Sequence, residues 1–179
     1  MITAKTVWHL EKEGRHLFID KGSSKKECSL IISSSQNVNT YLSCAIRAMT
    51  QETAKKLHLK KYICLREETF VLLGPFFIRI DKTEDESGGV NILIEEASGS
   101  FYYLNSTPLN RRLFSPLDTI LLPAEKPLSE ISERIFEYIV FSGIKNIIFS
   151  GEFAKEWSEK LTGNISKTIL QNYTQLELF

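Results

Sequence analysis

The sequence lacks an excess of charge of either sign, and it lacks any long hydrophobic run. Its 179 residues include 22 basic and 22 acidic side chains, so the formal net charge is zero. Domains that coat nucleic acid by charge alone are usually strongly basic, so we expect no strong direct binding of nucleic acid. No apolar run reaches the length of a signal peptide or a membrane span. These absences predict a cytoplasmic protein without a membrane partner.

Cysteine is also scarce. Cys28, Cys44 and Cys64 are far apart and odd in number, and the sequence contains no CxxC pair. Structural zinc sites and disulfide frameworks depend on closely spaced or even-numbered cysteines. The pattern therefore indicates buried free thiols in a reducing compartment, and we expect neither a metal nor a cofactor.

The length and the 42% share of hydrophobic residues are typical of one globular domain. Short runs rich in β-branched residues predict strands, and amphipathic runs predict helices. Strands are expected at 28–33, within 61–81, as a hairpin within 90–104, at 119–122 and at 145–150. Helices are expected at 38–57, at 129–143 with Ser129 as N-cap, and at 151–163, with a further helix or loop at 164–173. We therefore predict a single domain over residues 1–170, of mixed α/β or α+β class, with a central mixed sheet flanked by helices.

No catalytic motif stands out. Ser150-Gly151 lies between a predicted strand and a predicted helix, where backbone N–H groups could hold an anion, but a helix cap is the simpler role for Ser150. A metal-dependent nuclease needs carboxylates that converge at strand ends. Five carboxylates stand near predicted strand ends: Asp20, Asp81, Glu95, Glu96 and Asp118. Nothing fixes their mutual spacing, so we expect no catalytic residues and no metal ligands, and we place His9, His16 and His58 on the surface.

The last five residues, QLELF, carry the clearest motif. Gln175, Leu176, Leu178 and Phe179 form a glutamine–leucine–any–leucine–phenylalanine peptide. This peptide resembles the motif by which bacterial polymerases and repair proteins bind the DNA sliding clamp. The resemblance implies a clamp-binding tail, residues 171–179, that sinks apolar side chains into a pocket on the clamp, the beta subunit. The alternative is that the tail packs against its own domain.

A looser resemblance links the chain to the psi subunit of bacterial DNA polymerase III. The segments WHL, LIIS, IRAMT and SPL occur in the order of a tryptophan–x–leucine peptide, a strand, a helix and a later SPxL segment in that family. The resemblance implies an α/β domain that bridges the clamp loader to the single-strand-binding machinery. It also implies that Trp8 and Leu10 dock on a clamp-loader subunit, since tryptophan is a frequent interface anchor. Otherwise Trp8 is a staple on its own domain.

Together these features predict a DNA replication or repair accessory protein, an adaptor or clamp-loader-like subunit, that binds the sliding clamp through its C-terminal peptide. We expect an adaptor rather than an enzyme. Two alternatives stay open. The first is a metal-dependent nuclease or other DNA-processing enzyme recruited by the same tail. The second is a globular protein outside DNA metabolism whose tail packs on its own core.

Overall fold

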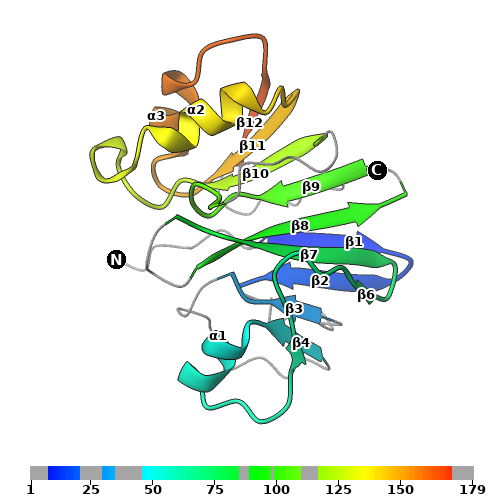
Figure 1. Cartoon of the computed structure of the whole chain (residues 1–179). Coiled ribbons are helices and arrows are strands. Elements are labelled where there is room, and N and C mark those ends of the chain that lie inside the picture. The colour runs from blue at the N-terminus through cyan, green and yellow to red at the C-terminus, as the bar shows by residue number, and fades with distance from the viewer. Residues whose placement is uncertain are drawn as a thin grey trace.

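The structure is a computed structural model, and it describes residues 8–20, 30–34, 46–84, 89–97, 99–109 and 117–170. These residues form two β-sheets with helices on their outer sides (Figure 1). Both sheets contain parallel and antiparallel pairs. The predicted α/β class is confirmed, with the strands shared between two mixed sheets.

The first sheet, sheet A, has the strand order β1-β2-β3-β4-β5. Its strands are β1 (Trp8–Lys12), β2 (Arg15–Ile19), β3 (Leu30–Ile32), β4 (Ile46–Met49) and β5 (Ile63–Cys64). β1 and β2 form an antiparallel hairpin, and the later pairs are parallel. The hairpin turns at Glu13 and Gly14, both of which have positive φ, as tight hairpin turns require.

The second sheet, sheet B, has the strand order β12-β11-β10-β9-β8-β7-β6. Its strands are β6 (Val71–Leu73), β7 (Phe76–Lys82), β8 (Val90–Glu96), β9 (Gly99–Tyr103), β10 (Thr119–Pro123), β11 (Asn146–Ser150) and β12 (Ser166–Ile169). Pairs from β6 to β9 are antiparallel, and pairs from β9 to β12 are parallel. In both sheets, strands that follow one another in the sequence are also neighbours in space.

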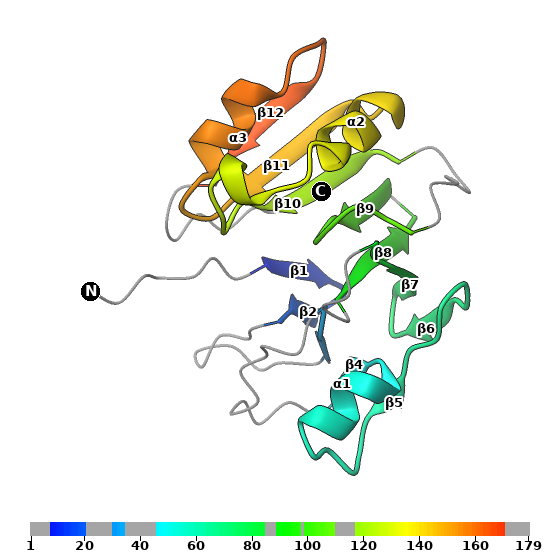
Figure 2. The same ribbon diagram turned by 60° about the vertical axis from the view of Figure 1, so that its left-hand side comes forward.

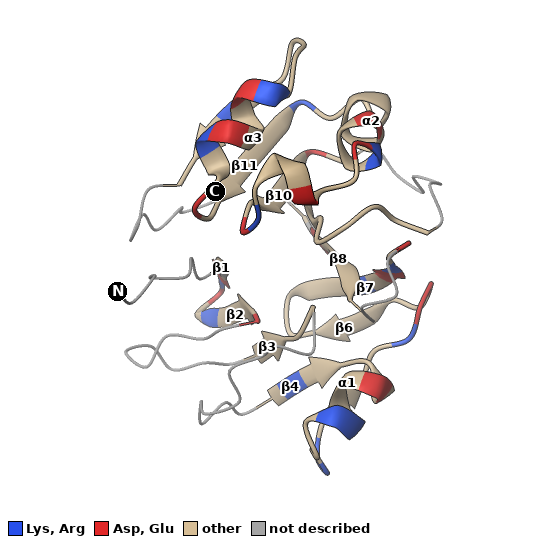
Figure 3. Ribbon diagram, turned by 90° about the vertical axis from the view of Figure 1, so that its left-hand side faces the viewer, with Lys and Arg blue, Asp and Glu red and all other residues tan. Residues whose placement is uncertain are grey.

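The helices are short and cover the outer faces of the sheets. They are α1 (Gln51–Lys56), the 3₁₀ turn η1 (Leu128–Glu130), α2 (Arg134–Phe141) and α3 (Ala154–Lys160). α1 lies beyond sheet A, whereas α2 and α3 lie beyond sheet B at the opposite end of the molecule (Figures 1 and 2). Both α1 and α3 contain basic and acidic residues, coloured blue and red on the ribbon of Figure 3. Within the described ranges, no helix is both long enough and apolar enough to cross a membrane.

Two apolar cores follow from the alternation of side chains along the strands. One core lies between the sheets and includes Leu17 and Ile19 of sheet A and Ile78 and Ile92 of sheet B. The other lies between sheet B and the helices α2 and α3, and it includes Trp157. Each fully buried large side chain contributes roughly 1.5–3 kcal/mol to folding. Sheet B is therefore covered on both faces: sheet A packs on one face, and α2 and α3 pack on the other.

Several predicted elements match the structure. The strands predicted at 28–33, 119–122 and 145–150 correspond to β3, β10 and β11, and the predicted hairpin corresponds to β8 and β9. The helix predicted at 151–163 corresponds to α3.

The helix predicted at 38–57 is wrong at residues 46–49 and confirmed at residues 51–56, and residues 38–45 lie outside the described ranges. Residues 46–49 form strand β4, and the helix α1 begins only at Gln51. Thr50 accepts a hydrogen bond of 3.2 Å from the Thr53 N–H, and this N-cap fixes the start of α1. Ala48 and Met49 are both buried although they point to opposite faces of sheet A. A strand that is buried on both faces carries consecutive apolar residues, which a helical spacing also fits.

Two further predicted elements differ. The helix predicted from Ser129 begins at Arg134 instead, and Ser129 lies in the 3₁₀ turn η1. The helix or loop predicted at 164–173 contains the strand β12, whose four residues are all exposed. An exposed strand at the edge of a sheet has no alternation of apolar and polar residues for a sequence to reveal.

Candidate functional site

The ends of strands from both sheets meet at one edge of the molecule, which we call the strand-end edge (Asp20, Ser33, Ser34, Tyr103 and Ser150). Asp20 directly follows β2, and Ser33 and Ser34 follow β3. Tyr103 ends β9, and Ser150 ends β11. The Tyr103 hydroxyl donates a hydrogen bond of 3.4 Å to Asp20 Oδ2, so the carboxyl ends of strands from the two sheets are in contact. Ligand sites of α/β proteins are commonly found at the carboxyl ends of parallel strands, which makes this edge the candidate site.

Asp20 is held by donors from two directions. The Ser34 backbone N–H donates to Oδ1 at 2.5 Å, and the Ser34 hydroxyl donates to Oδ2. The Tyr103 hydroxyl reaches the same Oδ2 from the other sheet. Asp20 has a φ of 61°, a conformation that aspartate tolerates better than most residues. Three protein donors therefore fix the orientation of one carboxylate at the boundary between the sheets.

Tyr103 bridges the sheets from within the inter-sheet core. Its ring meets the ring of Trp8 edge-on, with centroids 6.2 Å apart. Burial raises the pKa of Tyr103 well above its ordinary value of 10, and the negative charge of Asp20 raises it further. The hydroxyl consequently stays protonated at neutral pH and acts as a donor. A second contact between the sheets lies beside it, because the Val90 N–H donates to the Ser34 carbonyl at 2.8 Å.

Two buried hydroxyls at the strand-end edge have no hydrogen-bond partner within the described part of the chain, namely Ser33 Oγ and Ser150 Oγ. Their residues are 1% and 0% exposed. Buried polar groups are normally hydrogen-bonded, so an ordered water or a bound polar molecule is the expected partner. The predicted role of Ser150 as a helix cap is wrong, because α3 begins at Ala154 and its N-cap residue is Phe153.

Gly151 allows the chain to pass close to β10 at this edge. It has a φ of 99°, and a Cβ atom at this position would lie 2.6 Å from the Ala124 carbonyl oxygen. That oxygen accepts a hydrogen bond from the Phe153 N–H at 3.0 Å, and the Ala124 N–H donates to the Ser150 carbonyl at 2.6 Å. The turn after β11 is thus fastened to the end of β10, and no side chain larger than hydrogen fits at Gly151.

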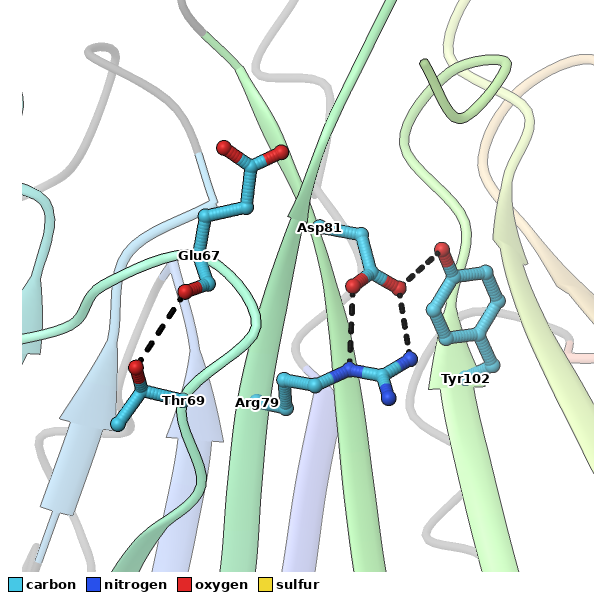
Figure 4. Close-up of polar contacts among 5 residues, drawn as sticks. All are labelled: Glu67, Thr69, Arg79, Asp81 and Tyr102. Carbon is cyan, nitrogen blue, oxygen red and sulfur yellow. Dashed lines mark hydrogen bonds and ion pairs between the residues drawn. The ribbon is translucent and has the colours of Figure 1, made fainter. Parts of the chain in front are cut away.

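A second polar cluster lies on the outer face of sheet B (Figure 4). Arg79 Nε donates to Asp81 Oδ1 at 3.1 Å, and Arg79 Nη2 donates to Asp81 Oδ2 at 3.2 Å. The Tyr102 hydroxyl donates to Asp81 Oδ2 at 3.0 Å. Burial, followed by the charge of Asp81, raises the pKa of the neighbouring Tyr138 to about 12. The two charges satisfy each other, so this cluster is a structural ion pair.

The carboxylates named from the sequence do not converge. Asp118, at the start of β10, accepts hydrogen bonds from the Ser100 N–H at 2.9 Å and the Ser100 hydroxyl at 3.1 Å. Ser100 lies opposite Glu95 on β8. The contact between Asp20 and Ser34 lies instead beside Val90, and five residues along β8 separate these two levels by about 16 Å. Asp20 and Asp118 are therefore at opposite ends of the strands.

The histidines do not supply a metal centre either. His16 Nδ1 lies 3.4 Å from Glu11 Oε2 at the far end of the β1–β2 hairpin, and His58 is exposed beyond the end of α1. His9 belongs to β1, level with Phe18. Across the residues that the structure describes, no three histidine, cysteine, aspartate or glutamate side chains come together as possible metal ligands.

Two predicted docking residues, Trp8 and Leu10, lie in β1 and are 7% and 8% exposed. Both belong to the inter-sheet core, where Trp8 supports Tyr103. The predicted clamp-binding residues fall outside the described ranges: Gln175, Leu176, Leu178 and Phe179.

No family model matches the sequence, and no curated protein matches it. Solved structures do match. The metallo-beta-lactamase fold protein YhfI from Bacillus subtilis aligns with a TM-score of 0.68 at 14% identity, over 94% of this chain and 90% of that one. Igni18, a metallo hydrolase from Ignicoccus hospitalis, aligns at 0.69 and 12%, over 94% and 93%. Zn²⁺-bound PqqB from Methylobacterium extorquens aligns at 0.62 and 9%, over 95% and 86%. At such identities the likeness establishes the fold, which is that of the metallo-beta-lactamase fold proteins.

These neighbours overturn the functional predictions made from short motifs. The resemblance to sliding-clamp-binding proteins and to the psi subunit is wrong as a family assignment, because the chain shares its fold with metallo-beta-lactamase fold proteins. The predicted clamp-binding adaptor in DNA replication or repair is contradicted on the same ground, and so is the expectation of an adaptor rather than an enzyme. A five-residue peptide carries no information about how the body of the chain folds.

Proposed function

We propose that the chain is a hydrolase whose reaction takes place at the strand-end edge. The observation that carries this proposal is the fold, which aligns over more than nine-tenths of the chain with structures that include a metallo hydrolase. The position of Asp20 supports it, since oriented polar groups at the carboxyl ends of parallel strands are typical of binding sites in α/β proteins.

Asp20 is the group that we propose to act on the substrate. Its carboxylate is oriented by hydrogen bonds from the Ser34 N–H and from the hydroxyls of Ser34 and Tyr103. A carboxylate placed in this way can accept a proton from a water molecule that attacks a carbonyl or phosphoryl group. Ser33 and Ser150 supply hydroxyls that a water or substrate oxygen can pair with.

The test compares Asp20→Asn with Asp118→Asn. Both aspartates accept two hydrogen bonds from a serine, but they lie at opposite ends of the strands. The substrates are chromogenic carboxylic and phosphoric esters together with single- and double-stranded DNA. We expect hydrolysis of at least one substrate class by the wild type, a loss of about 10²–10⁴-fold in kcat for Asp20→Asn, and wild-type activity for Asp118→Asn. Absence of any hydrolysis by the wild type, or equal activity of the two variants, contradicts the proposal.

We further propose that the protein works in the cytosol. Cys64 is a free and exposed thiol, and such thiols persist in reducing compartments.

A further inference from the structure

The fold neighbours raise the question of a resident metal ion, because the names of two of them include a metallo hydrolase and a zinc-bound protein. Catalytic zinc sites in proteins are built from three or more histidine, cysteine, aspartate or glutamate ligands. Among the side chains that the structure describes, His16 and His58 take part in no group of three such residues. The donor set of the described residues therefore does not fit a zinc centre.

The chemistry of the strand-end edge points the same way. The oxygens of Asp20 accept hydrogen bonds from protein donors. The Ser34 N–H donates to Oδ1, and the hydroxyls of Ser34 and Tyr103 donate to Oδ2. The other polar side chains that are buried there, Ser33 and Ser150, carry neutral hydroxyls. Neutral hydroxyls are not among the usual ligands of zinc, which binds thiolate, imidazole and carboxylate.

We infer that the described residues of the strand-end edge hold no resident metal ion, and that a hydrogen-bonded clamp of Asp20, Ser34 and Tyr103 joins the two sheets there. Asp20 and Ser34 belong to sheet A, and Tyr103 belongs to sheet B. The Val90 N–H, which donates to the Ser34 carbonyl, adds a second link between the same two sheets. This inference goes beyond the proposed function, because it holds whether or not the chain hydrolyses a substrate.

The first test measures metal content and stability of the full chain, purified without a metal-binding tag. After dialysis against zinc and then against metal-free buffer, we expect far less than one equivalent of zinc by mass spectrometry. We also expect the same melting temperature in EDTA and in zinc. Retention of one or more equivalents of zinc, or a melting temperature that EDTA lowers and zinc restores, overturns the inference.

The second test examines the clamp through Tyr103→Phe and Asp20→Asn, with Asp118→Asn as the matched control. We expect both clamp variants to melt about 2–6 °C below the wild type, by the same amount in EDTA and in zinc, and the control to melt close to the wild type. If zinc raises the melting temperature of the wild type but not of Asp20→Asn, Asp20 is a metal ligand and the inference is wrong. A zinc-free, EDTA-insensitive protein that hydrolyses nothing overturns the proposed function alone, and EDTA-sensitive hydrolysis by a zinc-loaded chain overturns this inference alone.

Discussion

Two aspartates of the chain are held in the same way at opposite ends of neighbouring parallel strands. Asp20 and Ser34 connect the carboxyl ends of β2 and β3, and Ser100 and Asp118 connect the amino ends of β9 and β10. In each pair, a serine donates both its backbone N–H and its hydroxyl to the carboxylate. The local motif is the same, and it ties two adjacent strands together at each place.

The difference lies in what else reaches the carboxylate. Asp118 is exposed, and Ser100, which donates to its carboxylate, belongs to the same sheet. Asp20 is half-buried and receives a third hydrogen bond from Tyr103 of the other sheet. A similar pair of serine hydrogen bonds therefore links two strands of one sheet at Asp118, whereas at Asp20 it lies at the boundary between the two sheets. Position in the fold, and not the motif, decides whether such an aspartate is a candidate for function.

The largest expected effect comes from removing the support under Tyr103. Trp8→Ala should lower the free energy of unfolding by about 3–5 kcal/mol, because a buried tryptophan leaves a cavity that its neighbours fill only in part. Thermal melting would show this as a fall of about 6–20 °C. Phe141→Ala is the control, since Phe141 is 95% exposed. Equal melting temperatures for the two variants would mean that Trp8 is not part of the core.

The next largest effect is expected at Gly151, which lies at the strand-end edge, and Gly99 at the opposite end of the strands serves as the comparison. Gly151→Ala should destabilise by about 3 kcal/mol, because it combines a left-handed φ with a contact of 2.6 Å to the backbone of Ala124. Gly99→Ala at the other end meets a side-chain oxygen, Asp118 Oδ2, at 3.2 Å, which is a less severe contact than the backbone contact at Gly151. Denaturant titration of both variants gives the two values. A larger loss for Gly99→Ala would reverse this ranking of the two ends.

Alkaline pH should weaken the folded state through its buried tyrosines. The pKa of Tyr138 is raised from 10 to about 12, chiefly by burial, and burial also raises the pKa of Tyr102 and Tyr103 well above 10. The unfolded chain ionises these groups near pH 10 while the folded chain does not, so stability is complete below pH 10 and falls as the pH rises above it. Tyr138 alone should account for at most about 1.4 kcal/mol per pH unit between 10 and 12.

Absorbance of tyrosinate near neutral and alkaline pH checks this expectation. The folded protein should show an incomplete titration that completes only when circular dichroism reports unfolding. Tyr138→Phe should shift the alkaline unfolding midpoint upward. Complete titration of all six tyrosines of the folded chain with ordinary values would contradict the burial of these three.

The smallest effect is the coupling across the sheet boundary. In a double-mutant cycle, Asp20→Asn and Tyr103→Phe should show a coupling free energy of about 0.5–1.5 kcal/mol, which is typical of one hydrogen bond. The same cycle with Asp118→Asn should be additive within about 0.5 kcal/mol, because the two sites are far apart. Urea unfolding of the single and double variants supplies both numbers. Coupling of Tyr103 to Asp118 and not to Asp20 would invalidate the comparison of the two aspartates.

The parts of the fold that the sequence predicts are those with a local cause. The β8–β9 hairpin has Gly99 directly after its turn, and Trp157 of α3 and its C-cap residue Leu161 follow a helical spacing on the buried side. The sequence does not reveal strand β4 because its buried apolar residues lie on both faces of the sheet. It does not reveal β12 because all residues of that strand are exposed. Division of the strands between two sheets depends on long-range packing, for which the local pattern contains no signal.

The candidate site shows the same limit. Asp20 is recognisable from the sequence as a carboxylate at the end of an apolar strand. Its partners are not, since Ser34 is 14 residues away and Tyr103 is 83 residues away. Neither serine nor tyrosine stands out by type, because both residues are common in loops and at strand ends. The tail motif is easy to recognise because it is short and contiguous. For the same reason it carries no information about how the rest of the chain folds.

The order of strands in the two sheets has a consequence for biosynthesis. Sheet A is complete by Cys64, and sheet B begins only at Val71, so a ribosome releases the whole of one sheet before any of the other. The β1–β2 hairpin is a local pairing that closes a short loop and forms early, whereas the parallel pairs of sheet A join strands further apart in the sequence. The inner face of sheet A, with Leu17, Ile19, Leu30 and Ile32, then stays uncovered until β7 to β9 are made, which takes about 40 further residues or roughly 2–8 s at ordinary rates of translation. The nascent chain passes through a stage with a flat apolar sheet exposed, and a chaperone that binds such surfaces would find its substrate at that stage.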